Sequence, residues 1–122
     1  MSGMFETLQG QQFINITTYR KNGQPVVTTV WFAQAGDRLV GTTMRQSGKI
    51  KRLRNQPQVS FAPSTATGQV LGEALPGVAR VLPPEEEEAA RTALRAKYGA
   101  HYDQITAQSD PAGRVYWEVK PV

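Results

Sequence analysis

The amino-acid sequence predicts a mainly β protein with a few helices (α+β), built as a small antiparallel β-barrel of six strands with helices at its ends. Two observations predict this fold. Short runs of β-branched and aromatic residues recur along the chain, and turn residues separate them. One helical segment follows the third run, and a second precedes the last run. With 122 residues and neither a repeat nor a linker, residues 1–122 are expected to form a single domain.

The first third of the chain predicts a short helix and three strands. Residues 4–10 favour the helix, and residues 13–20 favour a strand rich in isoleucine, threonine and aromatic side chains. The Asn22-Gly23 pair predicts a tight turn, because both residues tolerate positive φ. Two further strands follow, over residues 26–33 and 38–43. We expect the three strands to form an antiparallel meander.

A short basic helix follows the third strand. Ser47 is a suitable N-cap, and Pro57 ends the helix by forcing the residue before it out of helical space. Ile50 and Leu53, three residues apart, form the expected buried stripe. The pattern places Lys49 and Arg54 beside that stripe, with Lys51 and Arg52 projecting further outward.

The second half of the chain alternates β and helical segments. Val59 and Phe61 alternate with polar residues, as in a half-buried strand. Residues 69–82 read as a long strand interrupted at residues 75–77. Residues 83–98 form a helix with glutamates in its first turn and Gly99 as its stop. The remaining segments are residues 100–113, irregular or weakly helical, and residues 114–120, a last strand.

Composition excludes several classes of site. The chain has no cysteine, which excludes disulfides and thiolate metal sites, and its single histidine excludes a histidine-rich metal site. No Ser/His/Asp arrangement can be argued from the sequence. We expect no metal site. The N-terminal residues contain neither a basic leader nor an apolar stretch, and no run is long enough to cross a membrane. A cytoplasmic protein is therefore expected.

The basic helix predicts a phosphate site. Lysines near a helix N-terminus oppose the helix dipole, unless an anion offsets them, and free N–H groups at that end bind phosphate well. The residues expected to meet there are Thr42, Thr43, Ser47, Gly48, Lys49, Lys51 and Arg52. The alternative is a solvated surface helix without a ligand. The Gly-Lys pair lacks the remaining residues of a P-loop, so triphosphate hydrolysis is not supported.

The second strand is a candidate for binding a flat aromatic ring. Its central residues are Val27, Thr28, Thr29, Val30 and Trp31. The face with Thr29 and Trp31 could line a ligand, but the sequence pattern by itself favours an ordinary central barrel strand. His101 is expected to be structural or exposed. No catalytic residue can be named, so an enzymatic reaction would have to depend on a cofactor.

Several segments together resemble the pyridoxamine-phosphate-oxidase-like split-barrel superfamily. The similarity follows Thr18–Gly23, Val30–Ala33, Ser47–Arg54, Pro57–Val59, Ala62–Pro63 and Lys97–Gly99 in order, and spans about residues 5–120. Within the superfamily, the chain is most similar to the small deazaflavin- and flavin-dependent oxidoreductases of the B type. The resemblance implies a homodimer with two cofactor sites at the subunit interface. It also places the cofactor phosphate at Lys49 and Lys51, with the ring along residues 27–31 and 41–43.

The resemblance leads to one main functional hypothesis and several alternatives. The main hypothesis is an oxidoreductase that uses reduced coenzyme F-420, a deazaflavin, for hydride transfer to a small electron-poor substrate such as a quinone or an enone. The same fold could instead use FMN. A non-catalytic carrier of a flavin, haem or tetrapyrrole is a further alternative. Nucleic-acid binding ranks last, because residues 45–54 contain no aromatic side chain to stack on bases.

Overall fold

A computed structural model describes residues 11–44, 47–107 and 113–121. The strands are β1 (Phe13–Tyr19), β2 (Pro25–Trp31), β3 (Ala33–Ala35), β4 (Arg38–Met44), β5 (Gln58–Ser64), β6 (Leu75–Val81) and β7 (Arg114–Pro121). The helices are α1 (Gly48–Asn55), the 3-10 helix η2 (Pro84–Glu86), α2 (Glu87–Tyr98) and α3 (Ala100–Ala107). None of the helices in the described ranges has the length and apolar character needed to cross a membrane. The helix expected over residues 4–10 lies outside the described residues.

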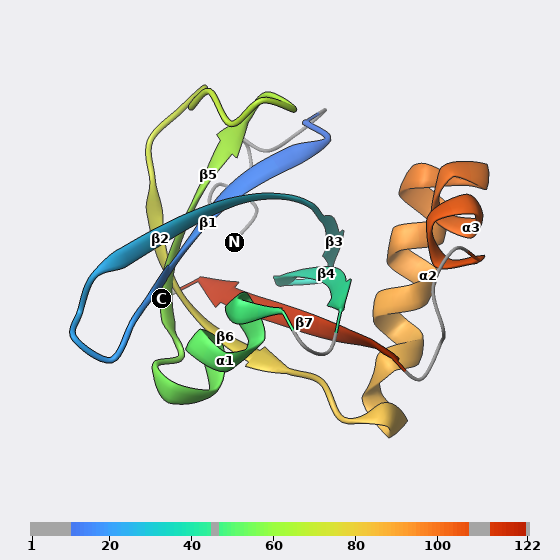
Figure 1. The fold of residues 1–122 in the computed structure, drawn as a ribbon. Helices are drawn as coiled ribbons and strands as arrows, with labels where there is room; N and C mark the ends of the chain where they lie inside the picture. The colour runs from blue at the N-terminus through green and yellow to red at the C-terminus, as the bar shows by residue number, and fades with distance from the viewer. Residues whose placement is uncertain (1–10, 45–46, 108–112, 122) are drawn as a thin grey trace.

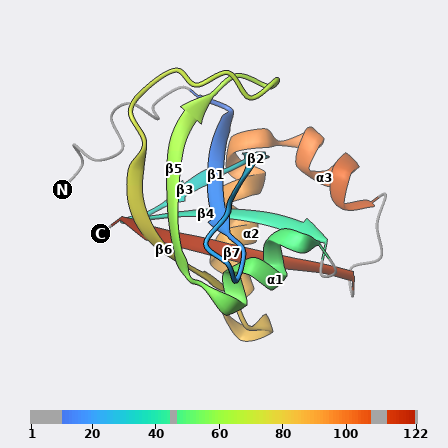
Figure 2. The same cartoon turned by 60° about the vertical axis from the view of Figure 1, so that its left-hand side comes forward.

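All strand pairs are antiparallel, in the order β2-β1-β5-β6-β7-β4-β3. The ends of this order, β2 and β3, are separated in the chain by Phe32 alone. The sheet must therefore curl until its two ends meet, which gives the rolled shape in Figures 1 and 2. The α+β class is confirmed, with seven strands in place of the expected six. The expected meander is wrong, because β5, β6 and β7 lie between the β1–β2 and β3–β4 hairpins.

The break at Phe32 divides the strand that was expected over residues 26–33. At this position the hydroxyl of Tyr98 accepts the N–H of Phe32 at 3.0 Å. The same hydroxyl has one hydrogen to donate, toward the carbonyl of Phe32 at 2.8 Å or that of Gln12 at 2.7 Å. Burial raises the pKa of Tyr98 to about 12, so the group stays protonated at neutral pH. The last residue of α2 thus substitutes for the sheet bonds that Phe32 gives up.

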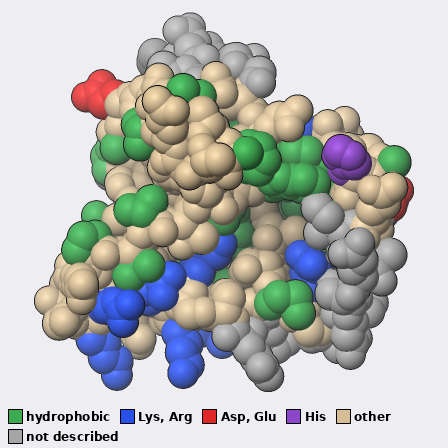
Figure 3. Space-filling view, turned by 45° about the horizontal axis from the view of Figure 1, so that its top comes forward, with side chains coloured by type: hydrophobic (Ala, Val, Ile, Leu, Met, Phe, Trp, Pro, Cys, Tyr) green, Lys and Arg blue, Asp and Glu red, His purple; other side chains and the backbone are tan. Residues whose placement is uncertain are grey.

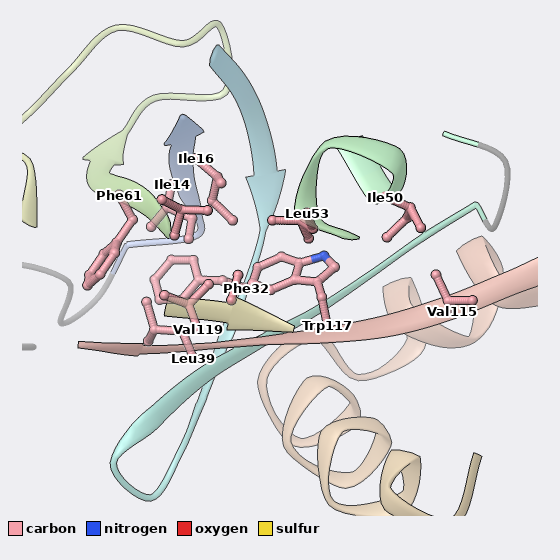
Figure 4. Close-up of a cluster of buried hydrophobic side chains, with 12 residues drawn as sticks. Ile14, Ile16, Phe32, Leu39, Ile50, Leu53, Phe61, Val115, Trp117 and Val119 are labelled. Atoms are coloured by element: carbon pink, nitrogen blue, oxygen red, sulfur yellow. The ribbon is translucent and has the colours of Figure 1, made fainter. Parts of the chain in front are cut away.

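The barrel interior is filled around Trp117 of β7, which is fully buried (Figure 4). Ile50 and Leu53 of α1 lie above its indole ring, and Leu39, Val119 and Phe32 lie beside it. Gly41 faces the ring from the neighbouring strand β4, and a Cβ at that position would lie 2.1 Å from Trp117. Glycine is therefore required at position 41, because any side chain would overlap the indole.

Three other segments differ in detail from expectation. The strand expected over residues 69–82 begins only at Leu75, although Val70 makes an isolated bridge to Ser64. The predicted helix over residues 83–98 forms, with a first turn of 3-10 geometry. Gly99 ends it with a positive φ of 57°. The segment after it contains a regular helix, α3, which is more ordered than the weak helix expected there.

On the face of the sheet that packs against α2, a buried carboxylate of β7 forms ion pairs with both neighbouring strands, β4 and β6. The side chain of Glu118 is 3% exposed and accepts bonds from Arg38 of β4 at 2.6 Å and Arg80 of β6 at 2.7 Å. Arg80 also pairs with Glu86 of η2. Burial alone would raise the pKa of Glu118, but the bonds from Arg80 and Arg38 outweigh it and the pKa is lowered.

Candidate anion site at the start of α1

The predicted N-terminus of α1 is confirmed. Ser47 adopts an extended backbone and its hydroxyl accepts the N–H of Ile50 at 3.4 Å. The N–H groups of Gly48 and Lys49 precede the first intrahelical bonds, and no described residue accepts them. Two backbone donors and the positive end of the helix dipole are therefore available to an anion.

Lys49 is the unusual residue of this helix. It is only 6% exposed, although it was expected to flank the buried stripe. It lies on the buried face with Ile50 and Leu53. Burial, together with the nearby charge of Arg52, lowers the pKa of Lys49 from 10.5 to about 8. Within the described residues no carboxylate lies within ion-pair distance of Lys49.

Arg52 does not project outward as expected. Its Nε donates to the hydroxyl of Thr18 on β1 at 2.6 Å, which turns the guanidinium back along the helix. A Cβ at Gly48 would lie 2.9 Å from Arg52 Nη1, so the guanidinium lies over the glycine of the first turn. Gly48 therefore leaves room for a cation beside the free N–H groups. Lys51, by contrast, is exposed.

Sequence reasoning missed two residues of this cluster, Thr18 and Arg20. Burial and the charge of Arg20 lower the pKa of Arg52, which places Arg20 near that guanidinium. Gln56 at the end of α1 donates to the carbonyl of Arg20 at 2.7 Å and fixes the β1–β2 turn against the helix. The only signal in the sequence was the basic character of residues 20 and 21, and nothing local links them to a helix that begins at residue 48.

The two threonines of β4 lie on opposite faces of the strand. Thr43 pairs with Val115, a residue of the core, and shares that side of the sheet with α1. Thr42 pairs with Tyr116 on the other side. Its hydroxyl donates to the carbonyl of Val115 at 2.9 Å and accepts from Arg114 at 3.4 Å. Thr43 is thus brought to the side of α1, and Thr42 is not.

The predicted ring-binding residues of β2 also divide between two faces. Thr28 and Val30 pair with the buried Ile16 and Ile14, so they face the barrel interior, as Thr18 does. Thr29 and Trp31 lie on the outer face with Val27. The side chains of Thr29 and Trp31 already have partners. Thr29 donates to Asn15 at 2.7 Å, and Trp31 stacks on Tyr98 with ring centroids 4.3 Å apart.

The backbone of β2 offers a second kind of contact. β2 ends the sheet order, so one of its edges pairs with no strand in the described part of the chain. Arg20 donates to Gln24 at 2.9 Å, which fixes the phase of the β1–β2 ladder. The antiparallel alternation then directs the N–H groups of Val27, Thr29 and Trp31 toward the open edge. These groups can donate to acceptor atoms at the rim of a flat ring.

The surface view separates a cationic region from an aromatic one. Lys and Arg side chains gather along one side of the molecule in Figure 3. His101, the single histidine of the chain, lies beside a hydrophobic group on another part of that face. The His101 ring lies 6.2 Å from that of Trp31. The cationic region is suited to a phosphate. None of the described side chains around it has an evident catalytic role.

Comparison with known proteins gives a family match and many structural neighbours. The family model described as pyridoxamine 5'-phosphate oxidase matches residues 3–122. HutZ, the haem storage protein from Vibrio cholerae, aligns with a TM-score of 0.74 and 16% identity, covering 98% of this chain and 88% of that one. An FAD-binding protein from Mesorhizobium loti aligns with a TM-score of 0.71 and 19% identity, covering 98% and 85%. An F420 reductase aligns with a TM-score of 0.63 and 20% identity, covering 97% and 92%.

At these identities the structural neighbours support the fold alone. Their ligands differ between haem, FAD and F420, although their folds are similar. No curated protein sequence matches the chain. The chemistry of the site must therefore be argued from its own residues.

Proposed function

The chain belongs to the pyridoxamine 5'-phosphate oxidase family, and from that premise we propose that it is an oxidoreductase that uses a phosphorylated deazaflavin, coenzyme F-420. The substrate would be a small electron-poor molecule such as a quinone or an enone. Reduced coenzyme F-420 would supply the hydride. The protein's residues would bind and orient the cofactor and the substrate.

One observation carries the proposal: Lys49 is buried, and none of the described carboxylates lies within ion-pair distance of it. An uncompensated ammonium in a protein interior is costly, and a bound phosphate would remove that cost. Arg52 adds a guanidinium over Gly48, and two free N–H groups complete a set of donors at the helix start. The residues present therefore fit the phosphate of a flavin or deazaflavin.

The ring would lie along β2, beside the N–H groups of its open edge. Fixed donors at a ring edge stabilise negative charge that develops there, and they do so without reorganisation. Thr28 and Val30 share the face of Thr18, which anchors Arg52. We assign them, with Thr43, to the cofactor side of the sheet. No side chain is assigned as a proton donor, and solvent would serve.

The extent of the cationic surface favours coenzyme F-420 over FMN. FMN carries a single phosphate, whereas coenzyme F-420 carries a phosphodiester and a polyglutamate tail. Lys51 and Arg54 are exposed on α1 beyond the buried Lys49, and Lys21 is exposed at the β1–β2 turn. These cations suit an extended polyanion better than one phosphate. We further propose that the protein acts as a cytoplasmic homodimer, with the two sites at the subunit interface.

A parallel fluorescence titration with coenzyme F-420 and FMN tests the proposal. We expect saturable binding of the deazaflavin, weaker binding of FMN, and loss of both in Lys49→Gln. Lys120→Gln, which removes an exposed lysine of β7, is the matched control and should bind normally. Tight binding of FMN alone would make FMN, and not coenzyme F-420, the cofactor. Binding of neither would overturn the enzyme proposal and make haem the next ligand to test.

A further inference from the structure

A second cationic pocket lies on the other face of β4, between α2, α3 and β7. Its volume is about 290 Å³. Its lining includes Arg91 and Arg95 of α2, Tyr102 of α3, and Arg114 and Tyr116 of β7. Thr42 contacts Arg114 on this side of the sheet, whereas Thr43 faces α1. The pocket is thus separated from Lys49 by the β4–β7 layer and is a different site.

Two guanidinium groups are held over two aromatic rings at this pocket. Arg91 Cζ lies 5.6 Å from the ring centroid of Tyr116, and Arg95 Cζ lies 5.4 Å from that of Tyr102. These contacts fix the cations at the pocket wall before any ligand binds.

Acidic side chains use only part of the hydrogen-bonding capacity of Arg91 and Arg95. Glu87 accepts from Arg91 at 2.8 Å, and Asp103 accepts from Arg95 at 3.3 Å. Each guanidinium has five N–H donors, so these single bonds leave donors of Arg91 and Arg95 free to bind a ligand. The lining also contains Arg114, a third basic side chain.

The tyrosine hydroxyls supply an independent sign of a missing acceptor. Tyr102 and Tyr116 are 3% and 5% exposed, and their oxygens lie 2.6 Å apart. Only one of the two hydroxyl hydrogens can lie between the oxygens, so the other must point elsewhere. No described residue accepts it. Burial raises the pKa of Tyr102, so its hydroxyl stays protonated at neutral pH.

From these contacts we propose that this pocket binds a small oxyanion, the phosphate or carboxylate group of a small molecule. An oxyanion consists of acceptors only, which matches the guanidinium N–H groups and the unused hydroxyl hydrogen. A pocket of about 290 Å³ is at the small end of ligand sites, so the ligand is the size of a small metabolite. The site is independent of the proposed cofactor.

The test titrates inorganic phosphate and malonate into the Lys49→Gln protein, in phosphate-free buffer, by calorimetry. Lys49→Gln removes the α1 site, so any remaining saturable binding reports the second pocket. Arg95→Gln should weaken it at least about tenfold without unfolding the protein, because that side chain is 61% exposed. Tyr102→Phe should weaken it as well, and Lys120→Gln should not.

Whichever anion binds more tightly identifies the preferred group. Absence of saturable binding of both anions would overturn the proposal, and so would equal binding in Lys49→Gln and in Lys49→Gln with Arg95→Gln. Amide chemical-shift changes in α2, α3 and β7 on adding the anion would place the binding there. Changes confined to α1 would contradict it.

Discussion

The Nε of Arg52 donates to the hydroxyl of Thr18 at 2.6 Å, and this bond joins α1 to the end of β1. Thr18 is fully buried, so its hydroxyl serves as a fixed anchor for the guanidinium. The bond determines that Arg52 lies over Gly48 and does not extend into solvent. The orientation of a cation at the candidate phosphate site therefore depends on a residue 34 positions earlier in the chain.

Thr18→Val should weaken cofactor binding while leaving the fold intact. Valine keeps the shape of threonine but cannot accept from Arg52, and a hydrogen bond to a charged group contributes about 1.5–3 kcal/mol. We expect roughly a tenfold or greater rise in the dissociation constant for coenzyme F-420, measured by fluorescence titration. Thr17→Val is the control, because Thr17 lies on the opposite face of β1. Equal affinities in the two variants would show that Arg52 does not act through Thr18.

Lys49→Met should stabilise the ligand-free protein while it abolishes phosphate binding. Methionine keeps the length of the lysine side chain and removes a buried charge with which no carboxylate of residues 11–44, 47–107 and 113–121 forms an ion pair. The lowered pKa of Lys49 corresponds to a gain of roughly 3 kcal/mol in unfolding free energy at neutral pH. Urea unfolding of the ligand-free wild type and of Lys49→Met measures this difference in unfolding free energy. A less stable variant would mean that the ammonium has a compensating partner in solution.

The same residue makes stability depend on pH. Between pH 8 and 10.5 the unfolded chain binds a proton at Lys49 that the folded protein has released, so stability should rise with pH in this interval. The Nζ of Lys97 lies 3.5 Å from the ring centroid of Phe32, and burial lowers the pKa of Lys97 to about 8. Lys97 should therefore also contribute to the rise in stability with pH. Lys49→Met should reduce the rise and not abolish it. Unfolding free energies measured from pH 7 to pH 10 would show this, and identical slopes would contradict it.

Tyr98→Phe should destabilise the strand break at Phe32. The change keeps the ring stacked on Trp31 but leaves the N–H of Phe32 without an acceptor, at a cost of about 1–3 kcal/mol. Urea unfolding followed by tryptophan fluorescence measures the loss. Tyr19→Phe should change stability by less than about 0.5 kcal/mol, since no described residue bonds to that hydroxyl. If the two variants were equally stable, the hydroxyl of Tyr98 would not hold the break.

Glu118→Gln should destabilise the barrel and change its response to acid. The amide would place donors against Arg38 or Arg80, and breaking a buried ion pair costs about 3–5 kcal/mol. We expect the unfolding free energy to fall by about 2 kcal/mol, because both arginines are partly exposed and can reach solvent.

In the wild type the pKa of Glu118 is lower in the folded state. Its contribution is therefore present above the ordinary pKa of 4.5 and is lost as the pH falls through the lowered value. The difference in unfolding free energy between wild type and Glu118→Gln should accordingly shrink in acid. A difference that stays constant from neutral pH to pH 2 would contradict this account.

Local features of the fold and the site could be predicted from the sequence. The Ser47 cap, the Asn22-Gly23 turn, α1 and α2 all depend on residues close together in the chain, and each is present. The position of Lys49 could not be predicted, because its burial depends on how the strands pack around α1. The break at Phe32 could not be predicted either, because β-forming residues continue through it. The group that stabilises the break, the hydroxyl of Tyr98, lies 66 residues away in the chain.

Thr42 and Thr43 lie on opposite faces of β4, which the sequence prediction overlooked. Strand periodicity alone implies that neighbours face opposite sides, yet both hydroxyls were assigned to one site because they adjoin the basic helix in sequence. The pairing of β4 with β7 shows which of them shares the side of α1. Sheet order and register are long-range properties. The sequence of residues 38–44 does not indicate that this strand pairs with residues 114–121.

The position of β7 also constrains the order of folding. Strands β1, β2, β5 and β6 can pair with one another as soon as residue 81 has been synthesised, but the β3–β4 hairpin joins them only through β7. Closure of the barrel must therefore wait for residues 114–121, after a long and entropically costly search. Before that point a nascent chain exposes the unpaired edges of β4 and β6, which makes the late insertion of one strand the step most open to aggregation.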